Sequence, residues 1–219
     1  MTGYRHVQNR GNVGSVIAAV CFTLFIFSLA VVLVLNAGWL YELEIRSLDL
    51  EKTAGMSAEE IRLNYQALIA YNRFWHRGAL AFPTLPMSES GRIHFQEVKR
   101  IFDAIQILCL AAGAASAAFL IRFKGRRRSD ALRLAGILTL IFAAAVVVLS
   151  LVGWERFFVL FHQLVFRNDY WLFDPATDPV ILILPDTYFL HCAAGIWLLA
   201  VLGGVICLLL SGRRRKRWT

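Results

Sequence analysis

Four long runs of apolar residues constrain this chain more than any other feature. The first run, residues 13–35, holds about 23 residues without a charge, and about 20 apolar residues in a helix cross the hydrocarbon core of a bilayer. Comparable runs cover residues 101–121, 134–153 and 188–210. Backbone amides inside hydrocarbon must be hydrogen-bonded within the chain, so such runs form helices. The pattern predicts an all-α multi-pass membrane protein with four transmembrane helices, in which residues 1–219 form a single integral membrane domain.

Two readings compete for the first run. It follows Arg5 and Arg10, so a secretory signal peptide is the alternative to a transmembrane helix. The run is longer than the apolar core of a signal peptide, and residues 36–39 offer a weak cleavage pattern. Both observations favour an uncleaved helix.

Positive charge predicts the orientation of the helices. The chain has 23 Lys and Arg against 15 Asp and Glu, a net charge of +8. The basic residues cluster at 122–133 and 213–217, beside apolar runs, without the interleaved aromatics of a nucleic-acid-binding surface. The positive-inside rule then places both termini in the cytoplasm and segments 37–100 and 154–187 outside, as an extracellular cap. We expect no nucleic-acid partner.

Local patterns predict elements within this cap. Residues 41–46 alternate apolar with charged side chains, a period of two that is typical of a short strand. Ser57 is followed three residues later by Glu60, a capping-box pattern that begins a helix. The cap is therefore expected to contain a short helix, with room for short strands.

Two histidines are the leading candidates for chemistry. His94 lies just before the second apolar run and His162 just after the third. Helices joined by a short loop are normally antiparallel neighbours, so these two ends should meet. Imidazole titrates near neutral pH and can accept and donate a proton, which makes a proton-transfer pair one interpretation. Two interfacial histidines that bond to backbone or headgroups are the other.

Further polar residues could assist the pair. Glu97 follows His94 by three residues and could orient its ring, or join the histidines in a metal site. Asp103 lies early in its run, where an acid is either functional or paired with a base. Asn168 and Asp169 belong to an acidic loop around Trp171 that serves either ligands or turns.

The sequence lacks an obvious nucleophile for covalent catalysis. It contains no G-x-S-x-G motif, and its four cysteines all fall within apolar runs, where they read as small buried hydrophobes. A covalent acyl-enzyme and a disulfide framework are therefore disfavoured.

A resemblance to a known family covers the whole four-helix layout, and short motifs in the two outer segments carry it. These motifs are Asn64, Tyr65 and Tyr71, the stretches 90–99 (SGRIHFQEVK) and 161–174 (FHQLVFRNDYWLFD), and residues 178–181 (DPVI) with Pro185. In these stretches the chain resembles the bacterial integral membrane family of lipoprotein intramolecular transacylases, Lit. Members commonly carry Asp where this chain has Glu97.

The resemblance implies an activity and a set of roles. The activity is transfer of the sn-2 acyl chain of a diacylglyceryl-modified lipoprotein to the α-amino group of its N-terminal cysteine, which gives a lyso-form lipoprotein. The family's essential histidines fall on His94 and His162. Supporting roles then go to Glu97, Asp103, Asn168, Asp169 and Trp171, and substrate-positioning roles to Asn64, Tyr65, Tyr71 and Arg92.

The resemblance also implies a setting. The protein would work as a monomer in the cell membrane of a Gram-positive bacterium, with its site at the extracellular face. Its partners would be the lipoprotein substrate and membrane lipids, and the reaction needs no cofactor or metal. Two alternatives stay open at this point: a lipid- or lipoprotein-binding protein without enzymatic activity, and a metal-dependent membrane hydrolase.

Overall fold

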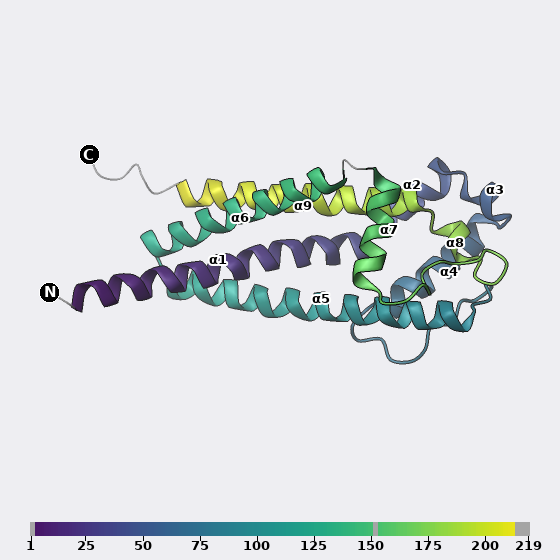
Figure 1. Ribbon diagram of the computed structural model, residues 1–219, viewed down its shortest axis with the longest axis horizontal. Coiled ribbons are helices and arrows are strands. Elements are labelled where there is room, and N and C mark those ends of the chain that lie inside the picture. Colours follow the sequence, from purple (N-terminus) through teal and green to yellow (C-terminus); the bar gives the residue numbers. More distant parts are fainter. Residues whose placement is uncertain (1–2, 151–152, 213–219) are drawn as a thin grey trace. The chain divides into compact units, whose positions relative to one another are not determined.

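The structure is a computed structural model that describes residues 3–150 and 153–212, with side chains described at 13–148 and 153–212. Within these ranges every regular element is a helix, and none is a strand (Figure 1). The helices are α1 (Gly3–Leu35), α2 (Gly38–Ser47), α3 (Leu50–Ala54), α4 (Ala58–Tyr71), α5 (Glu89–Arg122), α6 (Arg126–Ser150), α7 (Trp154–Val165), α8 (Val180–Ile183) and α9 (Asp186–Gly212).

Four of the helices are long and apolar enough to cross a membrane. They contain the candidate spans Val13–Leu35, Glu89–Arg122, Arg126–Val148 and Asp186–Gly212. The predicted all-helical class with four spans is therefore confirmed. Helix α5 has 34 residues, or about 51 Å at 1.5 Å per residue, which exceeds the roughly 30 Å of hydrocarbon in a bilayer. Its charged residues all precede the uncharged run 104–121 except for Arg122 at its end, so its first turns lie outside the hydrocarbon.

The chain divides into two units. The first is formed by α1 up to Val32, by residues 106–149 and by the chain from Gly195 onward. Small residues let its helices approach closely: a Cβ atom at Gly136 of α6 would lie 2.7 Å from the carbonyl oxygen of Gly204 in α9. Side chains add hydrogen bonds to this contact, since Trp197 Nε1 donates to the Ala143 carbonyl at 3.1 Å. Close backbone contact is the usual way in which membrane helices associate.

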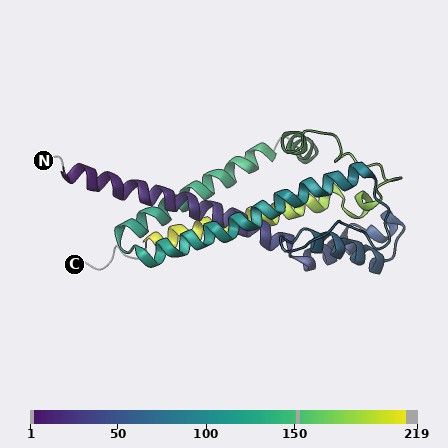
Figure 2. The ribbon, with the colours of Figure 1, turned by 90° about the horizontal axis from the view of Figure 1, so that it is seen from below.

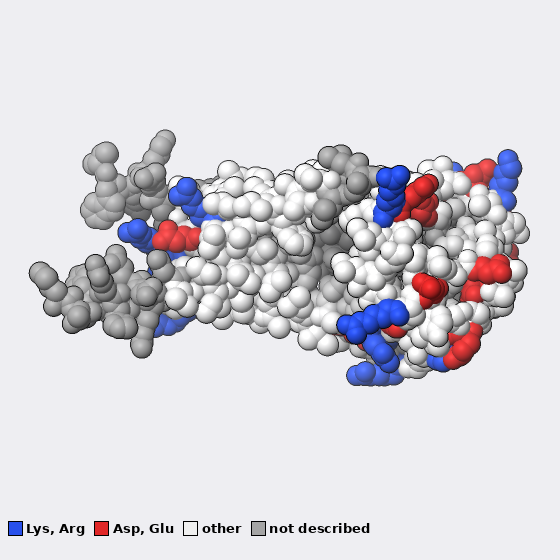
Figure 3. Space-filling model, viewed as in Figure 1, with Lys and Arg blue, Asp and Glu red and all other residues white. Residues whose placement is uncertain are grey.

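The second unit, here called the cap unit, comprises Leu33–Ile105 and Ser150–Ala194. It has its own apolar core, in which residues of α2, α4 and α8 meet the first turns of α5 and α9. Tyr41 stacks on Tyr65 with ring centroids 3.6 Å apart, and the Tyr65 and Tyr188 hydroxyls are hydrogen-bonded at 2.9 Å. On the face shown in Figure 3, basic and acidic side chains are interspersed over the cap unit.

The expected strand at residues 41–46 is wrong, because this segment is part of α2. Its buried residues are Tyr41, Glu44 and Ile45, at the spacing of three and four that places side chains on one helical face. Tyr41 and Ile45 also satisfy a period of two, so six residues could not separate the two patterns. Burial of Tyr41 and Ile45 against α3 and α4 favours the helix over the strand.

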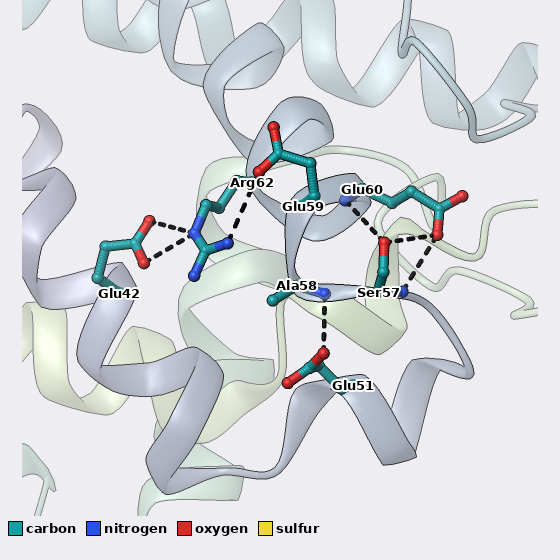
Figure 4. A network of polar contacts seen from close by, with 7 residues as sticks. All are labelled: Glu42, Glu51, Ser57, Ala58, Glu59, Glu60 and Arg62. Carbon is teal, nitrogen blue, oxygen red and sulfur yellow. Dashed lines mark hydrogen bonds and ion pairs between the residues drawn. The ribbon is translucent and has the colours of Figure 1, made fainter.

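The predicted capping box at the start of α4 is confirmed (Figure 4). Ser57 Oγ accepts from the Glu60 amide at 3.3 Å, and Glu60 Oε2 accepts from the Ser57 amide at 3.1 Å. Arg62, one turn further along, binds both carboxylate oxygens of Glu42 in α2 at 2.9 Å through Nε. These bonds fix the start of α4 and its place beside α2.

Replacing Ser57 by Ala should destabilise the cap unit, because the first turn of α4 loses the hydroxyl that accepts its amide. Loss of such a cap costs about 1 kcal/mol. We expect the midpoint of thermal unfolding, followed by circular dichroism in detergent, to fall by a few degrees. Ser57→Thr keeps the hydroxyl and serves as the control; an equal loss in both variants would contradict a capping role.

Candidate functional site

The first turn of α5 carries His94 and is held from outside the helix. Ser88 caps the helix, because its Oγ accepts from the Gly91 amide at 3.0 Å. The buried carboxylate of Asp178 accepts from the Ser88 amide at 2.8 Å. A Cβ atom at Gly91 would lie 2.3 Å from Asp178 Oδ1, so glycine permits this close approach. Asp178 therefore positions the start of α5, a turn-forming role rather than a ligand role.

Helix α7 carries His162. It begins after Gly153, whose φ of 107° lies in the region that glycine adopts most easily. Trp154 Nε1 donates to the Asp186 carbonyl at 3.1 Å, which ties the start of α7 to the start of α9. Figures 1 and 2 show α7 running across the direction of α5.

The two imidazoles are neighbours, as the hairpin argument predicts. Their ring centroids lie 6.2 Å apart with an interplanar angle of 33°. Aromatic rings surround both imidazoles. The ring centroids of Phe166 and Phe173 lie 4.7 Å and 5.4 Å from that of His94, and the ring centroid of Trp171 lies 4.8 Å from that of His162. The His94 residue is 6% exposed, whereas His162 is half-buried.

This apolar surround keeps both rings uncharged at neutral pH. Burial, with a smaller effect from the neighbouring His162, lowers the pKa of His94 from 6.5 to about 4. Burial also lowers the pKa of His162, partly offset by its hydrogen bond to the Phe158 carbonyl. Desolvation disfavours the imidazolium ion, so each ring takes up a proton at a lower pH than an exposed histidine would.

Hydrogen bonding selects one tautomer of His162. Its Nδ1 lies 2.8 Å from the carbonyl oxygen of Phe158, and a carbonyl oxygen accepts but cannot donate. Nδ1 must therefore carry the hydrogen. In the neutral ring the lone pair is then on Nε2, which makes Nε2 the atom able to accept a proton.

The loop after α7 is tied to α5 by a carboxylate and an amide. Asn168 Nδ2 donates to both oxygens of Glu97, at 3.0 Å and 3.2 Å. Asn168 Oδ1 in turn accepts from the Tyr170 amide at 3.1 Å. We expected Glu97 to orient His94, but these two bonds point its carboxylate to Asn168. The contact holds the loop that brings Phe166 and Trp171 against the histidines.

Two buried polar atoms of this site have no hydrogen-bond partner among the described residues. They are Nδ1 of His94 and Nε1 of Trp171, a residue that is 9% exposed. An unpaired buried polar atom costs about 1–3 kcal/mol. The indole N–H can donate and cannot accept. Both atoms are available to a bound molecule.

The remaining candidates lie in other contacts. Asn64 is fully buried and links α4 to Thr84, donating to its hydroxyl at 2.7 Å and accepting from its amide at 3.2 Å. Tyr65 belongs to the tyrosine stack of the core. Asp169 is exposed, and its carbonyl accepts from the Leu172 amide at 3.1 Å.

Tyr71 and Asp103 meet at Lys99. The Lys99 ammonium lies 5.3 Å from the centroid of the Tyr71 ring and 3.1 Å from Asp103 Oδ1. Asp103 is thus paired with a base, one of the two readings left open by the sequence. Arg92 forms an ion pair with Glu89 one turn before it.

Some contacts of the site were missed from the sequence. Phe166 and Phe173 contact His94 directly, yet an aromatic residue in a loop gives no signal of its own. The buried Glu44 pairs with His191 at 2.7 Å between Oε1 and Nδ1. Glu44 was missed because Glu42, two positions earlier, is an acid of the same kind and no local pattern shows which of the two is buried. Among the described residues, no three His, Cys, Asp or Glu side chains form a group that could hold a metal ion.

The fold and site define a class: an integral membrane protein in which a cap unit encloses a pair of uncharged histidines. Comparison with known proteins gives the family. The family model for lipoprotein intramolecular transacylase Lit matches residues 16–189, so the chain belongs to the Lit family. No curated protein matches it in a sequence comparison.

Solved structures of the membrane integral Lit from Bacillus cereus are similar over nearly the whole chain. One has a TM-score of 0.87 at 37% identity, covering 93% of this chain and 94% of that one. Two variants of the same protein, with a histidine replaced by arginine or by alanine, give TM-scores of 0.85 at 36% identity. They cover 95% of this chain and 93% and 94% of theirs, respectively.

Nuclear magnetic resonance of ¹⁵N-histidine-labelled protein should show both rings uncharged at pH 7. His162 should give the shifts of the Nδ1–H tautomer. On acidification His162 should become charged below its usual pKa of 6.5, and His94 only near pH 4, because burial penalises the ion. His94→Phe and His162→Phe assign the signals. An Nε2–H tautomer at His162, or a charged ring at pH 7, would contradict the proposed geometry.

Proposed function

We propose that the chain moves the sn-2 acyl chain of a diacylglyceryl-modified lipoprotein to the α-amino group of its N-terminal cysteine. The observation that carries this proposal is that two uncharged imidazoles, the buried His94 and the half-buried His162, are neighbours. Their place in a chain of the Lit family supports the same reaction. The product is a lyso-form lipoprotein with an acylated amine.

His162 is the general base in this proposal. Its Nδ1–H is held by the Phe158 carbonyl, so Nε2 presents a lone pair. An α-amino group has a pKa near 8, and its free-base form attacks the ester carbonyl. Nε2 removes the proton that the nitrogen loses as the bond forms. The Phe158 carbonyl then stabilises the imidazolium, as its effect on the pKa of His162 indicates.

His94 and Trp171 supply hydrogen bonds to the carbonyl oxygen as it gains charge. Both carry a buried nitrogen that lacks a partner among the described residues. Donors already in place, in a site that excludes water, stabilise such an oxyanion with little reorganisation. A neutral His94 with its hydrogen on Nδ1 donates one bond, and the indole N–H donates another.

The reaction balances without an enzyme nucleophile. The amine nitrogen forms a bond to the acyl carbon, and the bond from that carbon to the sn-2 oxygen breaks. The proton passes from the amine to His162 and then to the departing oxygen. Nucleophile and ester belong to one substrate, so holding that molecule in place supplies the proximity that the reaction needs.

The setting follows from the sequence. The basic clusters at 122–133 and 213–217 support cytoplasmic termini and a site that faces outward. The acyl chains would lie along the apolar surface of the spans, and the protein would act as a monomer. Glu97 and Asn168 support the site indirectly, through the loop that holds Trp171.

His94→Ala and His162→Ala should each lower the rate of transacylation by roughly 10²- to 10⁴-fold, the usual contribution of a general acid or base. The measurement is mass spectrometry of the lipoprotein N terminus after incubation of diacylated lipoprotein with proteoliposomes. His76→Ala, a histidine that contacts the Tyr71 ring, is the control and should retain the rate. Formation of the N-acylated lyso product by both site variants at the wild-type rate would contradict the paired-histidine mechanism.

Trp171→Phe should keep the ring against His162 but lose the N–H. We expect kcat to fall by roughly 10²-fold with KM little changed, because the lost bond forms to the oxyanion and not to the ground state. Trp75→Phe, at an exposed position of the cap unit, is the matched control. A wild-type kcat in Trp171→Phe would remove the indole from the mechanism and leave the histidines in place.

A further inference from the structure

Helix α7 has three distinct sides, although it is a short helix outside the four candidate spans. One side contacts the rest of the cap unit through Trp154, Phe158 and His162, which are spaced four residues apart. At 3.6 residues per turn, this spacing forms a single stripe along the helix. The two remaining sides differ in chemistry.

The first of them is apolar and exposed. Leu160, Phe161 and Leu164 are 60%, 46% and 82% exposed, and at 3.6 residues per turn they fall within an arc of about 100° around the helix. The second is exposed and mainly polar, with Glu155, Arg156 and Gln163 beside Val159, which is 40% exposed. A helix with an apolar side, a charged side and aromatic residues is typical of a membrane–water interface.

The orientation of α7 within the cap unit agrees with this chemistry. Within the cap unit, α7 runs across the first turns of α5 (Figures 1 and 2). A helix that lies in the membrane plane can present one long side to lipid and another to water.

The distance of His94 from the far end of α5 also agrees with an interfacial position for α7. His94 stands 28 residues from Arg122 along α5, about 42 Å at 1.5 Å per residue. The hydrocarbon accounts for about 30 Å of that length, so the histidine pair lies roughly 10 Å outside it, in or beside the headgroup layer. At such a depth an amphipathic helix places its apolar side toward the acyl chains.

The chain holds α7 near the bilayer. Trp154 lies six positions after Val148, the last residue of the third candidate span, and six positions of chain extend over about 21 Å at most. Exposing the three large apolar side chains of Leu160, Phe161 and Leu164 to water is unfavourable. The short connection to the span and the apolar composition therefore both favour contact with lipid.

We propose that α7 is an interfacial helix whose apolar side, formed by Leu160, Phe161 and Leu164, contacts the acyl chains of the bilayer. Its polar side, with Arg156 and Gln163, faces the headgroups and water. Resting on the proposed function, this arrangement sets His162 beside the boundary where glyceryl esters lie. The ester then reaches the base while its acyl chains stay in the membrane.

Photocrosslinking at neighbouring positions tests the proposal. Benzoylphenylalanine is introduced at Leu164 or at Gln163 in protein reconstituted into vesicles of dioleoylphosphatidylcholine and dioleoylphosphatidylglycerol. After illumination, lipid adducts are counted by mass spectrometry of the intact protein. Leu164 should label at a level similar to Leu198, an exposed residue in the span of α9. It should label about fivefold more than Gln163, because an interfacial helix places its apolar side among the acyl chains and its polar side at the headgroups.

Both positions are exposed, so neither substitution disturbs a core. Equal labelling at 164 and 163, or stronger labelling at 163, would overturn the proposal. So would a protein adduct at 164 with twice the mass, because a second copy would then cover this side. The measurement needs no turnover, so it is decided independently of the transacylase assay.

Discussion

The lack of water in the hydrocarbon core governs the rest of this structure. Backbone groups there must bond within a helix, and charged side chains are displaced to the helix ends. In α5 the charges occupy the first turns, and an uncharged run from 104 to 121 follows. Chemistry that needs ionisable groups is therefore confined to the polar ends of the helices. His94, ten residues before that run, is placed there by this constraint.

Burial has two effects on the histidine pair. It lowers the pKa of both rings, so that both are uncharged bases at neutral pH. It also leaves Nδ1 of His94 and Nε1 of Trp171 without partners among the described residues. Each unpaired atom costs about 1–3 kcal/mol, a cost that a bound ester carbonyl would remove. The same aromatic surround thus tunes the base and prepares the donors.

Much of the fold was predictable because its signals are local. The four spans follow from composition, the start of α4 from Ser57 and Glu60, and the meeting of His94 and His162 from one short loop. The strand expected at 41–46 failed because burial of Glu44 and Ile45 depends on distant residues. The partner of Glu97 was missed for the same reason. Asn168 reaches it across 71 positions of sequence, and no local pattern reports such a contact.

The interruption between α6 and α7 explains how His162 comes to lie beside His94. His94 lies 28 residues from Arg122 along α5, about 42 Å. Had α6 run on unbroken from Arg126, His162 would stand 36 residues along it, about 54 Å from its start. An overshoot of about 12 Å would separate the two rings. Helix α6 ends at Ser150 instead, and α7 begins as a separate helix after Gly153, which adopts a φ of 107° as its N-cap residue. The interruption between α6 and α7 therefore allows His162 to lie beside His94.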